Sequence, residues 1–210
     1  MSGTLVKICG LSTSDTLAAA VRAGASHVGL VHFAKSPRHL ALADAARLRA
    51  LVPAHVKAVL LVVNPERQLL AEAVRVVRPD VVQFHGAETP DALARFRSET
   101  GIEAWRAMAV KDAASLADVA QFRGAADRVL LDAPASSLPG GNGTAFDWRL
   151  LAGWQAPLAW GLAGGLNPAN VGEAIRLTGA PLVDTSSGVE SAPGIKDVDR
   201  IAAFCKAARL

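Results

Sequence analysis

Short runs of apolar, often β-branched residues recur along the chain at a nearly constant interval, and this feature constrains the fold most. Alanine-rich segments with helical spacing, such as QLLAEAVRVV, lie between the runs. The starts of the runs are roughly 22–30 residues apart, the length of a strand, a loop, a short helix and a return loop. The pattern predicts eight strands alternating with eight helices, with strands at 5–9, 27–32, 56–63, 80–84, 104–110, 128–132, 157–162 and 181–184.

The predicted strands are typical of a parallel sheet. Runs such as VKAVLLVV and RVLLD are apolar on both faces, as strands covered by helices on one side and by a core on the other must be. Eight such units predict the α/β class and a single (β/α)8 TIM barrel with eight parallel strands, one domain over 1–210. The alternative is an open doubly wound sheet, but no G-x-G-x-x-G follows the first run.

Local signals refine this picture. Asn64-Pro65, Thr89-Pro90 and Asn167-Pro168 each combine a capping side chain with a proline, which predicts three helix starts. The Gly/Ser/Pro-rich stretch 133–143 lies inside one repeat, between the sixth strand and its helix. We therefore expect this stretch to be an active-site loop and not a domain boundary.

Composition excludes several classes of protein. No apolar run approaches the roughly 18–20 residues of a membrane helix, and the N-terminus lacks a signal-peptide pattern, so we expect a cytoplasmic location without membrane contact. The net charge is +3 with dispersed Lys and Arg, which argues against nucleic acid and is compatible with a small anionic ligand. Cys9 and Cys205 have no metal-like spacing and are expected to be free thiols. The sequence is compatible with a monomer or a homodimer.

Polar side chains follow the strands at their carboxyl ends, where barrels carry their functional sites. Cys9 ends the first run beside Gly10, and Lys7 points to the same side two residues earlier. An ammonium beside the thiol would favour the thiolate, a useful base or nucleophile. Cys9 is otherwise a small buried hydrophobe, and Lys7 is otherwise the structural partner of an inward carboxylate such as Asp184.

Other strand ends carry an acid and possible anion-binding groups. Asp132 ends the run VLLD, where it is either a loop-capping carboxylate or, if partly buried and protonated, a general acid. Glycine-rich loops follow the last two runs, at the place where barrels commonly bind phosphate through backbone N–H groups, although tight turns alone would also require glycine. The expected phosphate ligands in these loops are Gly164, Gly165, Ser186, Ser187 and Gly188.

Two further residues are weaker candidates for ligand binding. Arg38, in SPR after the second run, has the geometry to bind a carboxylate with two hydrogen bonds, although a surface arginine is the plainer interpretation. His85, in QFHG after the fourth run, is either structural or supporting. The remaining histidines show no ligand spacing, so we expect no metal and no cofactor. The chain has no tyrosine, which excludes phenolic acid–base chemistry.

Together these motifs resemble those of the phosphoribosylanthranilate isomerase family of tryptophan biosynthesis. The segments KICG, VGLVHFAKSPRHL, VQFHGAE, LLDAP…GGNGTAFDW, LAGGLNPANV and VDTSSGVESAPGIKD match in order from Lys7 to Asp197. The resemblance implies a (β/α)8 barrel and an Amadori rearrangement of N-(5-phosphoribosyl)anthranilate to 1-(2-carboxyphenylamino)-1-deoxyribulose 5-phosphate. The small-molecule phosphosugar would be its only partner besides a second copy of the chain.

The resemblance also implies roles for individual residues. Cys9 would be the general base and Asp132 the general acid. Arg38 would bind the anthranilate carboxylate, the two glycine-rich loops would bind the phosphate, and His85 and Asp184 would support binding. The chain departs from the family pattern at Asn142 in GGNG, at His32 where an aromatic residue is usual, and at Thr185 where valine is usual.

Rival hypotheses are other phosphosugar barrels and a catalytically inactive barrel. A histidine-pathway isomerase would have an aspartate where this chain has Cys9, and a pentose-phosphate epimerase would need a His/Asp metal site. An inactive barrel that binds a phosphorylated ligand or a protein would have no need of both Cys9 and Asp132.

Overall fold

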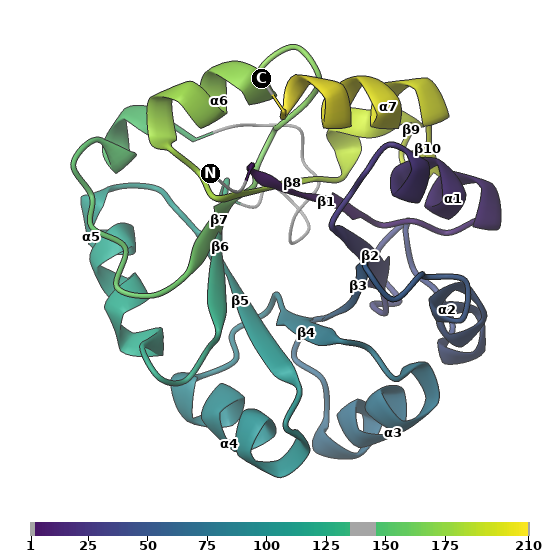
Figure 1. Cartoon of the computed structure of the whole chain (residues 1–210). Coiled ribbons are helices and arrows are strands. Elements are labelled where there is room, and N and C mark those ends of the chain that lie inside the picture. Colours follow the sequence, from purple (N-terminus) through teal and green to yellow (C-terminus); the bar gives the residue numbers. More distant parts are fainter. Residues whose placement is uncertain (1–2, 135–145, 210) are drawn as a thin grey trace.

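The eight predicted strands form a closed barrel in which each strand is parallel to its neighbours. The computed structural model describes residues 3–134 and 146–209, and Figure 1 shows the strands as an inner ring surrounded by helices. The strands follow one another around the barrel in chain order, and β8 closes it against β1. Their bounds are β1 Leu5–Cys9, β2 His27–Val31, β3 Lys57–Val62, β4 Val81–Phe84, β5 Glu103–Ala109, β6 Arg128–Asp132, β7 Trp160–Leu162 and β8 Leu182–Thr185.

The helices cover the outside of the barrel, but the unit after β6 differs from the prediction. Its described part contains only the short 3-10 helix η2 (Trp148–Leu151), which ends before Gly153 in the left-handed conformation. The described residues of this unit therefore do not contain the α-helix that the sequence predicted. The α-helices are α1 Ser14–Arg22, α2 Leu42–Arg49, α3 Arg67–Val77, α4 Pro90–Thr100, α5 Ala113–Ala117, α6 Val171–Thr178 and α7 Val198–Ala207, and the 3-10 helix η1 (Asp118–Phe122) continues α5.

The three predicted helix starts have different outcomes. Thr89 caps α4 by accepting a hydrogen bond from the Ala92 N–H, and Pro90 is the first helical residue, as predicted. The other two predictions are wrong, since α3 begins at Arg67 and α6 at Val171. The Asn64 side chain accepts a hydrogen bond from the backbone of Ala87, on the next βα loop, and so connects two loops in place of capping a helix.

The core has two layers, as the apolar runs predicted. One cluster, formed by strand residues, includes Val59, Val81, Trp105, Leu130 and Leu182. A larger cluster joins the strands to the helices. Strands buried on both faces explain why the runs are apolar throughout and do not alternate.

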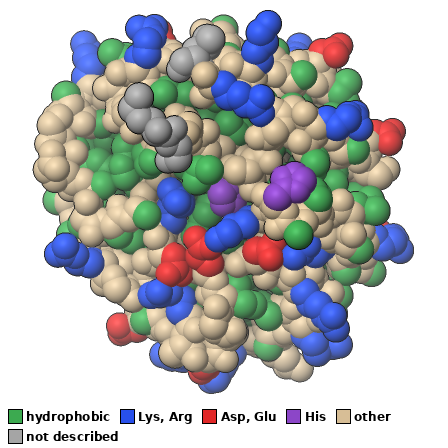
Figure 2. All heavy atoms as spheres, in the orientation of Figure 1, with side chains coloured by type: hydrophobic (Ala, Val, Ile, Leu, Met, Phe, Trp, Pro, Cys, Tyr) green, Lys and Arg blue, Asp and Glu red, His purple; other side chains and the backbone are tan. Residues whose placement is uncertain are grey.

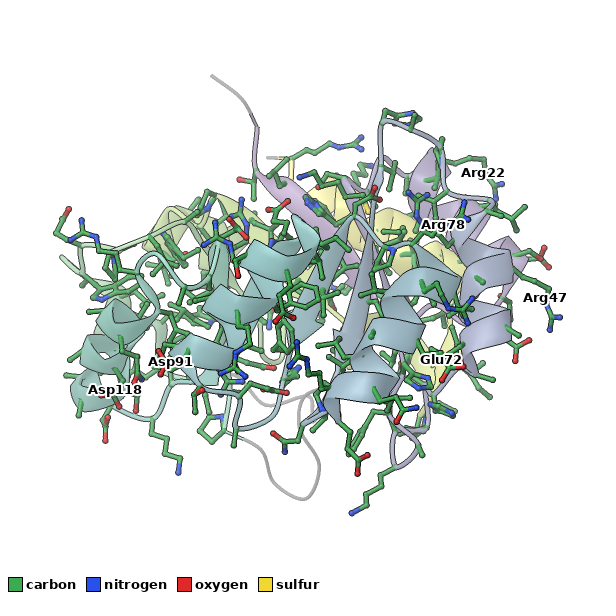
Figure 3. The ribbon with its side chains drawn as sticks, turned by 90° about the horizontal axis from the view of Figure 1, so that it is seen from below. Arg22, Arg47, Glu72, Arg78, Asp91 and Asp118 are labelled. Atoms are coloured by element: carbon green, nitrogen blue, oxygen red, sulfur yellow. The ribbon has the colours of Figure 1, made fainter. Side chains whose placement is uncertain are left out.

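The surface seen in the figures carries charges of both signs. Figure 2 shows basic side chains scattered over the face it draws, with acidic ones between them, and Figure 3 shows Arg22, Arg47 and Asp118 on the outside of the helical layer. Across the described parts of the chain, no helix has the length and apolarity needed to cross a membrane.

Candidate active site

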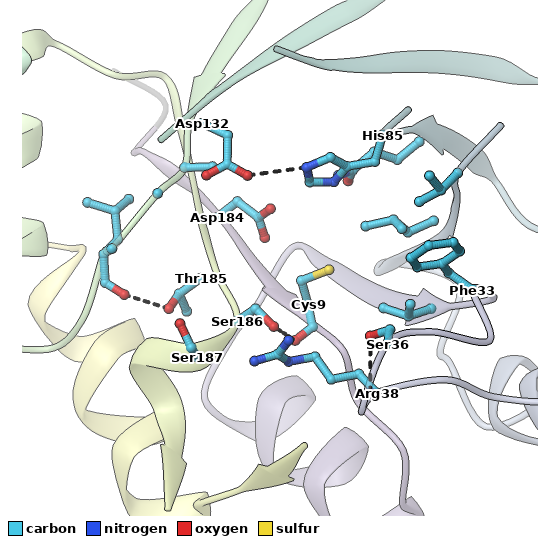
Figure 4. A pocket seen from close by; sticks show the side chains of 18 residues that line it. Cys9, Phe33, Ser36, Arg38, His85, Asp132, Asp184, Thr185, Ser186 and Ser187 are labelled. Carbon is cyan, nitrogen blue, oxygen red and sulfur yellow. Dashed lines mark hydrogen bonds and ion pairs between the residues drawn. The ribbon is translucent and has the colours of Figure 1, made fainter. Parts of the chain in front are cut away.

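A cleft with about 610 Å³ of empty space lies at the carboxyl ends of the strands, and it brings together most of the residues that the sequence singled out. Figure 4 shows side chains from β1, β6 and β8 and from the loops after β2, β4 and β8 facing the same space. Of the residues expected from the sequence, the cleft is lined by Cys9, Arg38, His85, Asp132, Gly164, Gly165, Asp184, Ser186 and Ser187.

Cys9 is the last residue of β1, with its side chain in the cleft and little exposed surface. It is paired in register with Gly29 of β2. A Cβ atom built on Gly29 would lie 2.8 Å from the Cys9 Sγ, closer than atoms pack in proteins. The absence of a side chain at Gly29 therefore makes room for the thiol.

Lys7 lies below Cys9 on the same strand and is fully buried. Its Nζ donates to both carboxylate oxygens of Asp184, at 3.0 and 2.9 Å, because β1 and β8 place these two residues side by side. The sequence offered Asp184 as a structural partner for Lys7, and this ion pair is the contact observed. Asp184 still lines the cleft, with both oxygens engaged by the ammonium.

The protonation of Cys9 differs from the simple expectation that Lys7 favours the thiolate. Burial raises the pKa of the Cys9 thiol above its ordinary value. The Lys7 ammonium lowers this pKa and the Asp184 carboxylate raises it, so the ion pair cancels part of the benefit. Desolvation therefore outweighs the neighbouring charge, and the resting sulfur is a thiol.

Asp132 ends β6 across the cleft and is held from two sides. Its Oδ1 accepts the backbone N–H of Ala133 at 2.8 Å, and its Oδ2 lies 3.4 Å from Nε2 of His85. The other ring nitrogen of His85, Nδ1, is 3.3 Å from Nε2 of Gln83. Figure 4 shows Asp132 and His85 facing each other across the top of the pocket. The carboxyl group of Asp132 thus lines the cleft in an orientation set by two contacts.

The two glycine-rich loops lie on the β7–β8 side of the same cleft. Gly164 and Gly165 both have positive φ, and a Cβ on Gly164 would lie 2.5 Å from the backbone N of Ala133. Between the described residues, no hydrogen bond uses the N–H of Gly164 or of Gly165. Gly188 does not line the cleft, but a Cβ there would overlap the carbonyl oxygen of Leu166, so this glycine lets the two loops pack together.

Arg38 also lines the cleft, but it already has a carboxylate partner within the protein. Its Nε and Nη2 donate to the two oxygens of Glu190, at 2.6 and 2.7 Å. Gly10 permits this path, because a Cβ on Gly10 would lie 2.6 Å from the Arg38 Cδ. The sequence offered Arg38 as the ligand of a substrate carboxylate or as a surface arginine, and the structure pairs its largely buried side chain with a carboxylate of the protein itself.

The structure describes two of the three residues that depart from the family pattern. Asn142, and with it most of the expected loop 133–143, lies outside the described residues. His32 is turned away from the cleft, and its Nδ1 contacts the carbonyl of Leu40 at 2.9 Å. Thr185 lines the cleft, and its hydroxyl donates to the Leu166 carbonyl at 2.7 Å.

Some residues at the site were not assigned a role from the sequence. Phe33, Ser36 and Gln83 line the cleft, and Glu190 and Lys196 lie behind it. Position was the available signal for the first three, since they follow β2 or end β4. Glu190 and Lys196 gave no such signal, because they come after β8 in the short hairpin of β9 (Glu190–Ala192) and β10 (Ile195–Lys196).

Comparison with known proteins agrees with the fold. The sequence model of the family described as N-(5'phosphoribosyl)anthranilate (PRA) isomerase matches residues 6–207. The N-(5'-phosphoribosyl)anthranilate isomerase of Erythrobacter litoralis is 62% identical over 206 residues, which cover 98% of this chain and 99% of that protein.

Two solved structures extend the comparison to three dimensions. A phosphoribosylanthranilate isomerase in complex with reduced 1-(o-carboxyphenylamino)-1-deoxyribulose 5-phosphate superposes with a TM-score of 0.86 at 33% identity, covering 98% of each chain. A monomeric form of the dimeric enzyme of Thermotoga maritima superposes with a TM-score of 0.85 at 34% identity, again over 98% of each chain. From the family match, the identity and the shared barrel, we conclude that the chain belongs to the N-(5'-phosphoribosyl)anthranilate isomerase family of tryptophan biosynthesis and is an isomerase.

Proposed function

We propose that this isomerase uses Cys9 as general base and Asp132 as general acid in the Amadori rearrangement of N-(5'-phosphoribosyl)anthranilate. The observation that carries the proposal is the position of the two side chains, which come from β1 and β6 and line one cleft. A thiol and a carboxyl group are suited to moving protons at carbon and oxygen. The reaction needs two such groups on one substrate.

The reaction begins with opening of the ribose ring. Asp132 gives its Oδ2 proton to the ring oxygen, the C1–O bond breaks, and the nitrogen lone pair forms a C1=N iminium. Cys9 then loses its thiol proton to water in the cleft. The resulting thiolate takes the proton from C2, and the C–H electrons form a C1=C2 double bond as the iminium is neutralised. Tautomerisation of this enolamine, with loss of the hydroxyl proton at C2 and gain of a proton at C1, gives the aminoketose.

The raised pKa of Cys9 is compatible with this role. A thiolate with a raised pKa is a stronger base once it forms. The iminium places a positive charge in the cleft beside the sulfur, where little water screens it, and this charge favours the thiolate at the moment it is needed. The substrate thus contributes to the activation of its own base.

Both ends of the substrate have binding groups in the cleft. The N–H groups of Gly164 and Gly165, with Ser186, Ser187 and the turn at Gly188, suit the phosphate, because backbone donors in glycine-rich loops approach an anion closely. Arg38, on the β2 side, suits the anthranilate carboxylate. Binding at both ends would fix C1 and C2 between acid and base.

His85 and the Lys7–Asp184 pair have supporting roles in this proposal. His85 fixes the orientation of Asp132 through its contact with Oδ2. Asp184 has oxygen lone pairs facing the cleft that suit the sugar hydroxyls, and Lys7 holds that carboxylate in place. We further infer that residues 1–210 form one domain and that the enzyme acts in the cytoplasm. Sedimentation of the purified protein distinguishes a monomer from a homodimer.

The test uses purified variants and a fluorescence assay for loss of N-(5'-phosphoribosyl)anthranilate. Cys9→Ser and Asp132→Asn each preserve shape and should lower kcat by about 10²–10⁴-fold, the usual contribution of a general acid or base. The matched control is Cys205→Ser, since Cys205 is also a buried thiol but lies in α7, away from the cleft. The control should keep its kcat. Near-normal kcat in either site variant would overturn the assignment of that residue.

A further inference from the structure

Two buried charged residues behind the cleft have no role in the reaction as described so far. Glu190 and Lys196 lie in the hairpin of β9 and β10, which follows β8. Their side chains are 4% and 0% exposed, and their charged ends are 2.6 Å apart. Burying two charged groups is costly unless their hydrogen bonds are satisfied, so the arrangement calls for an explanation.

Glu190 holds Arg38 by one edge of its guanidinium group. Its two oxygens accept from Nε and Nη2 of Arg38, and Oε2 also faces the Gly194 N–H at 3.3 Å. The edge between Nη1 and Nη2 carries one proton of Nη1 and the second proton of Nη2. Among the described residues, Nη1 of Arg38 has no hydrogen-bond partner. Glu190 therefore anchors Arg38 by one edge of the guanidinium group, and the other edge keeps two N–H donors for a second carboxylate.

Lys196 completes the cluster. Its Nζ donates to Oε1 of Glu190 at 2.6 Å, to the Ser186 carbonyl at 2.8 Å and to the Ser186 hydroxyl at 3.1 Å, which uses all three of its N–H bonds. The Ser186 hydroxyl in turn donates to the carbonyl of Cys9 at 3.1 Å. One network thus joins Arg38, the loop after β8 and the end of the strand that carries Cys9. Figure 4 shows the Ser186–Cys9 part of it.

The charges of the cluster explain why the lysine is needed. Glu190 alone would neutralise Arg38 and leave little attraction for an anion. Lys196 adds a second positive charge, so that the three side chains together carry one net positive charge. This charge lies behind the cleft on side chains with little solvent exposure, so solvent screens it weakly.

The hairpin is in close contact with the loop that carries Arg38. Gly194, at the turn of the hairpin, has a φ of +82°, and a Cβ there would lie 2.6 Å from the carbonyl oxygen of Pro37. Only glycine adopts this conformation readily and allows the contact. The hairpin therefore fixes the backbone beside Arg38 as well as its guanidinium group.

We propose that Glu190, supported by Lys196, is the positioning residue that presents the free edge of Arg38 to the anthranilate carboxylate of the substrate. The inference rests on the proposed function, because it takes that carboxylate as the partner of Arg38. A long arginine side chain is ordered during folding and not during binding, and such preorganisation increases affinity. Glu190 acts through Arg38 and does not touch the reacting carbons.

The first test compares ligand binding with and without the carboxylate. The probes are reduced 1-(2-carboxyphenylamino)-1-deoxyribulose 5-phosphate and the analogue made with a phenylamino group in its place. Glu190→Gln should weaken binding of the carboxylated probe by about 10-fold or more, the effect of losing charged hydrogen-bond geometry, and leave the other probe within about threefold. Equal weakening of both probes, or of neither, would overturn the proposal.

The matched control is Asp127→Asn. Asp127 also pairs with an arginine, with Arg97 Nη2 at 2.6 Å, but it precedes β6 and so lies at the opposite end of the barrel from the cleft. This variant should bind both probes normally. Loss of carboxylate preference in the control as well would show a general effect of destabilisation and would count against the proposal.

A double-mutant cycle separates positioning from a general structural role. In the Arg38→Ala background, Glu190→Gln should cause no further rise in KM, because the residue through which it acts is gone. A further rise equal to that in the native background would overturn the inference. If Glu190→Gln does not fold, Arg38→Lys tests the same geometry, since an ammonium lacks the second edge. Full carboxylate preference in Arg38→Lys would also overturn it.

These results are independent of the catalytic assignment. Probe affinities report on the Arg38 carboxylate site even if Cys9→Ser or Asp132→Asn keeps its kcat, which is the outcome that would overturn the proposed function. Loss of kcat in those variants together with unaltered carboxylate preference in Glu190→Gln would overturn only the present inference.

Discussion

His27 should make the stability of the barrel sharply dependent on pH, and replacing it by glutamine isolates the effect. Its ring lies in the barrel beside Trp105, with centroids 5.0 Å apart, and its Nδ1 contacts the Ser26 hydroxyl at 2.8 Å. Burial lowers the pKa of His27 from 6.5 to about 3. The nearby positive charges of Lys7, Arg128 and Lys57 lower it further, and Glu103 raises it slightly. The folded barrel therefore keeps this imidazole neutral.

The magnitude follows from the difference in proton uptake between the two states. Below pH 6.5 the unfolded chain binds a proton at this histidine and the folded chain does not, so stability falls as the pH decreases toward about 3. Each pH unit in this window costs up to about 1.4 kcal/mol. Integrated from pH 7 to pH 5, the loss from His27 is about 2 kcal/mol. For a chain of this size that corresponds to a fall in Tm of about 4–8 °C.

The assay is urea unfolding of the native protein and of His27→Gln at pH 7 and pH 5, followed by tryptophan fluorescence. Glutamine keeps a polar group near Ser26 but does not titrate. The difference in free energy of unfolding between the two proteins should move by about 2 kcal/mol in favour of the variant on going from pH 7 to pH 5. A difference that is the same at both pH values would show that His27 is not held neutral by the barrel.

Two further predictions concern the base and its surroundings. The double variant Lys7→Met and Asp184→Asn removes the ion pair without leaving a buried lone charge. The pH at which kcat/KM reaches half its maximum should rise, because Lys7 lowers the pKa of Cys9 more than Asp184 raises it; a profile that is unchanged or shifted to lower pH would contradict this. In Gly29→Ala the added methyl group would displace the Cys9 sulfur and should reduce kcat by about 10²-fold with a normal circular dichroism spectrum. An active Gly29→Ala enzyme would mean that Cys9 needs no such exact placement.

Much of the fold was predictable because it depends on local patterns. The apolar runs repeat at the period of a βα unit, and the predicted ranges of the first and sixth strands match β1 and β6. The unit after β6 was not predictable in the same way, since its described part contains only the short η2, after a stretch of the sequence rich in glycine and proline. Asn-Pro pairs were also misleading, because the asparagine at 64 bonds to a neighbouring loop and not to the first turn of a helix.

The site was predictable to the extent that it depends on strand ends. Parallel strands in a barrel all end at one rim, so residues that follow different strands were expected to meet. The partners of those residues were not predictable. Arg38 and Glu190 are 152 positions apart, and Lys7 and Asp184 are 177 apart, so no local pattern links them.

The sequence by itself determined the barrel and the set of polar residues at its mouth, because hydrophobic period and position along a strand are local properties of the chain. Only the tertiary structure decided which charges pair and which stay free for a ligand. Closure of β8 against β1 brings Lys7 within 3 Å of Asp184, and the return of the β9–β10 hairpin brings Glu190 within 3 Å of Arg38. Burial inside the barrel raises the pKa of Cys9 despite the lysine beside it. Distance and desolvation govern these interactions, and both are set by packing that no single segment encodes.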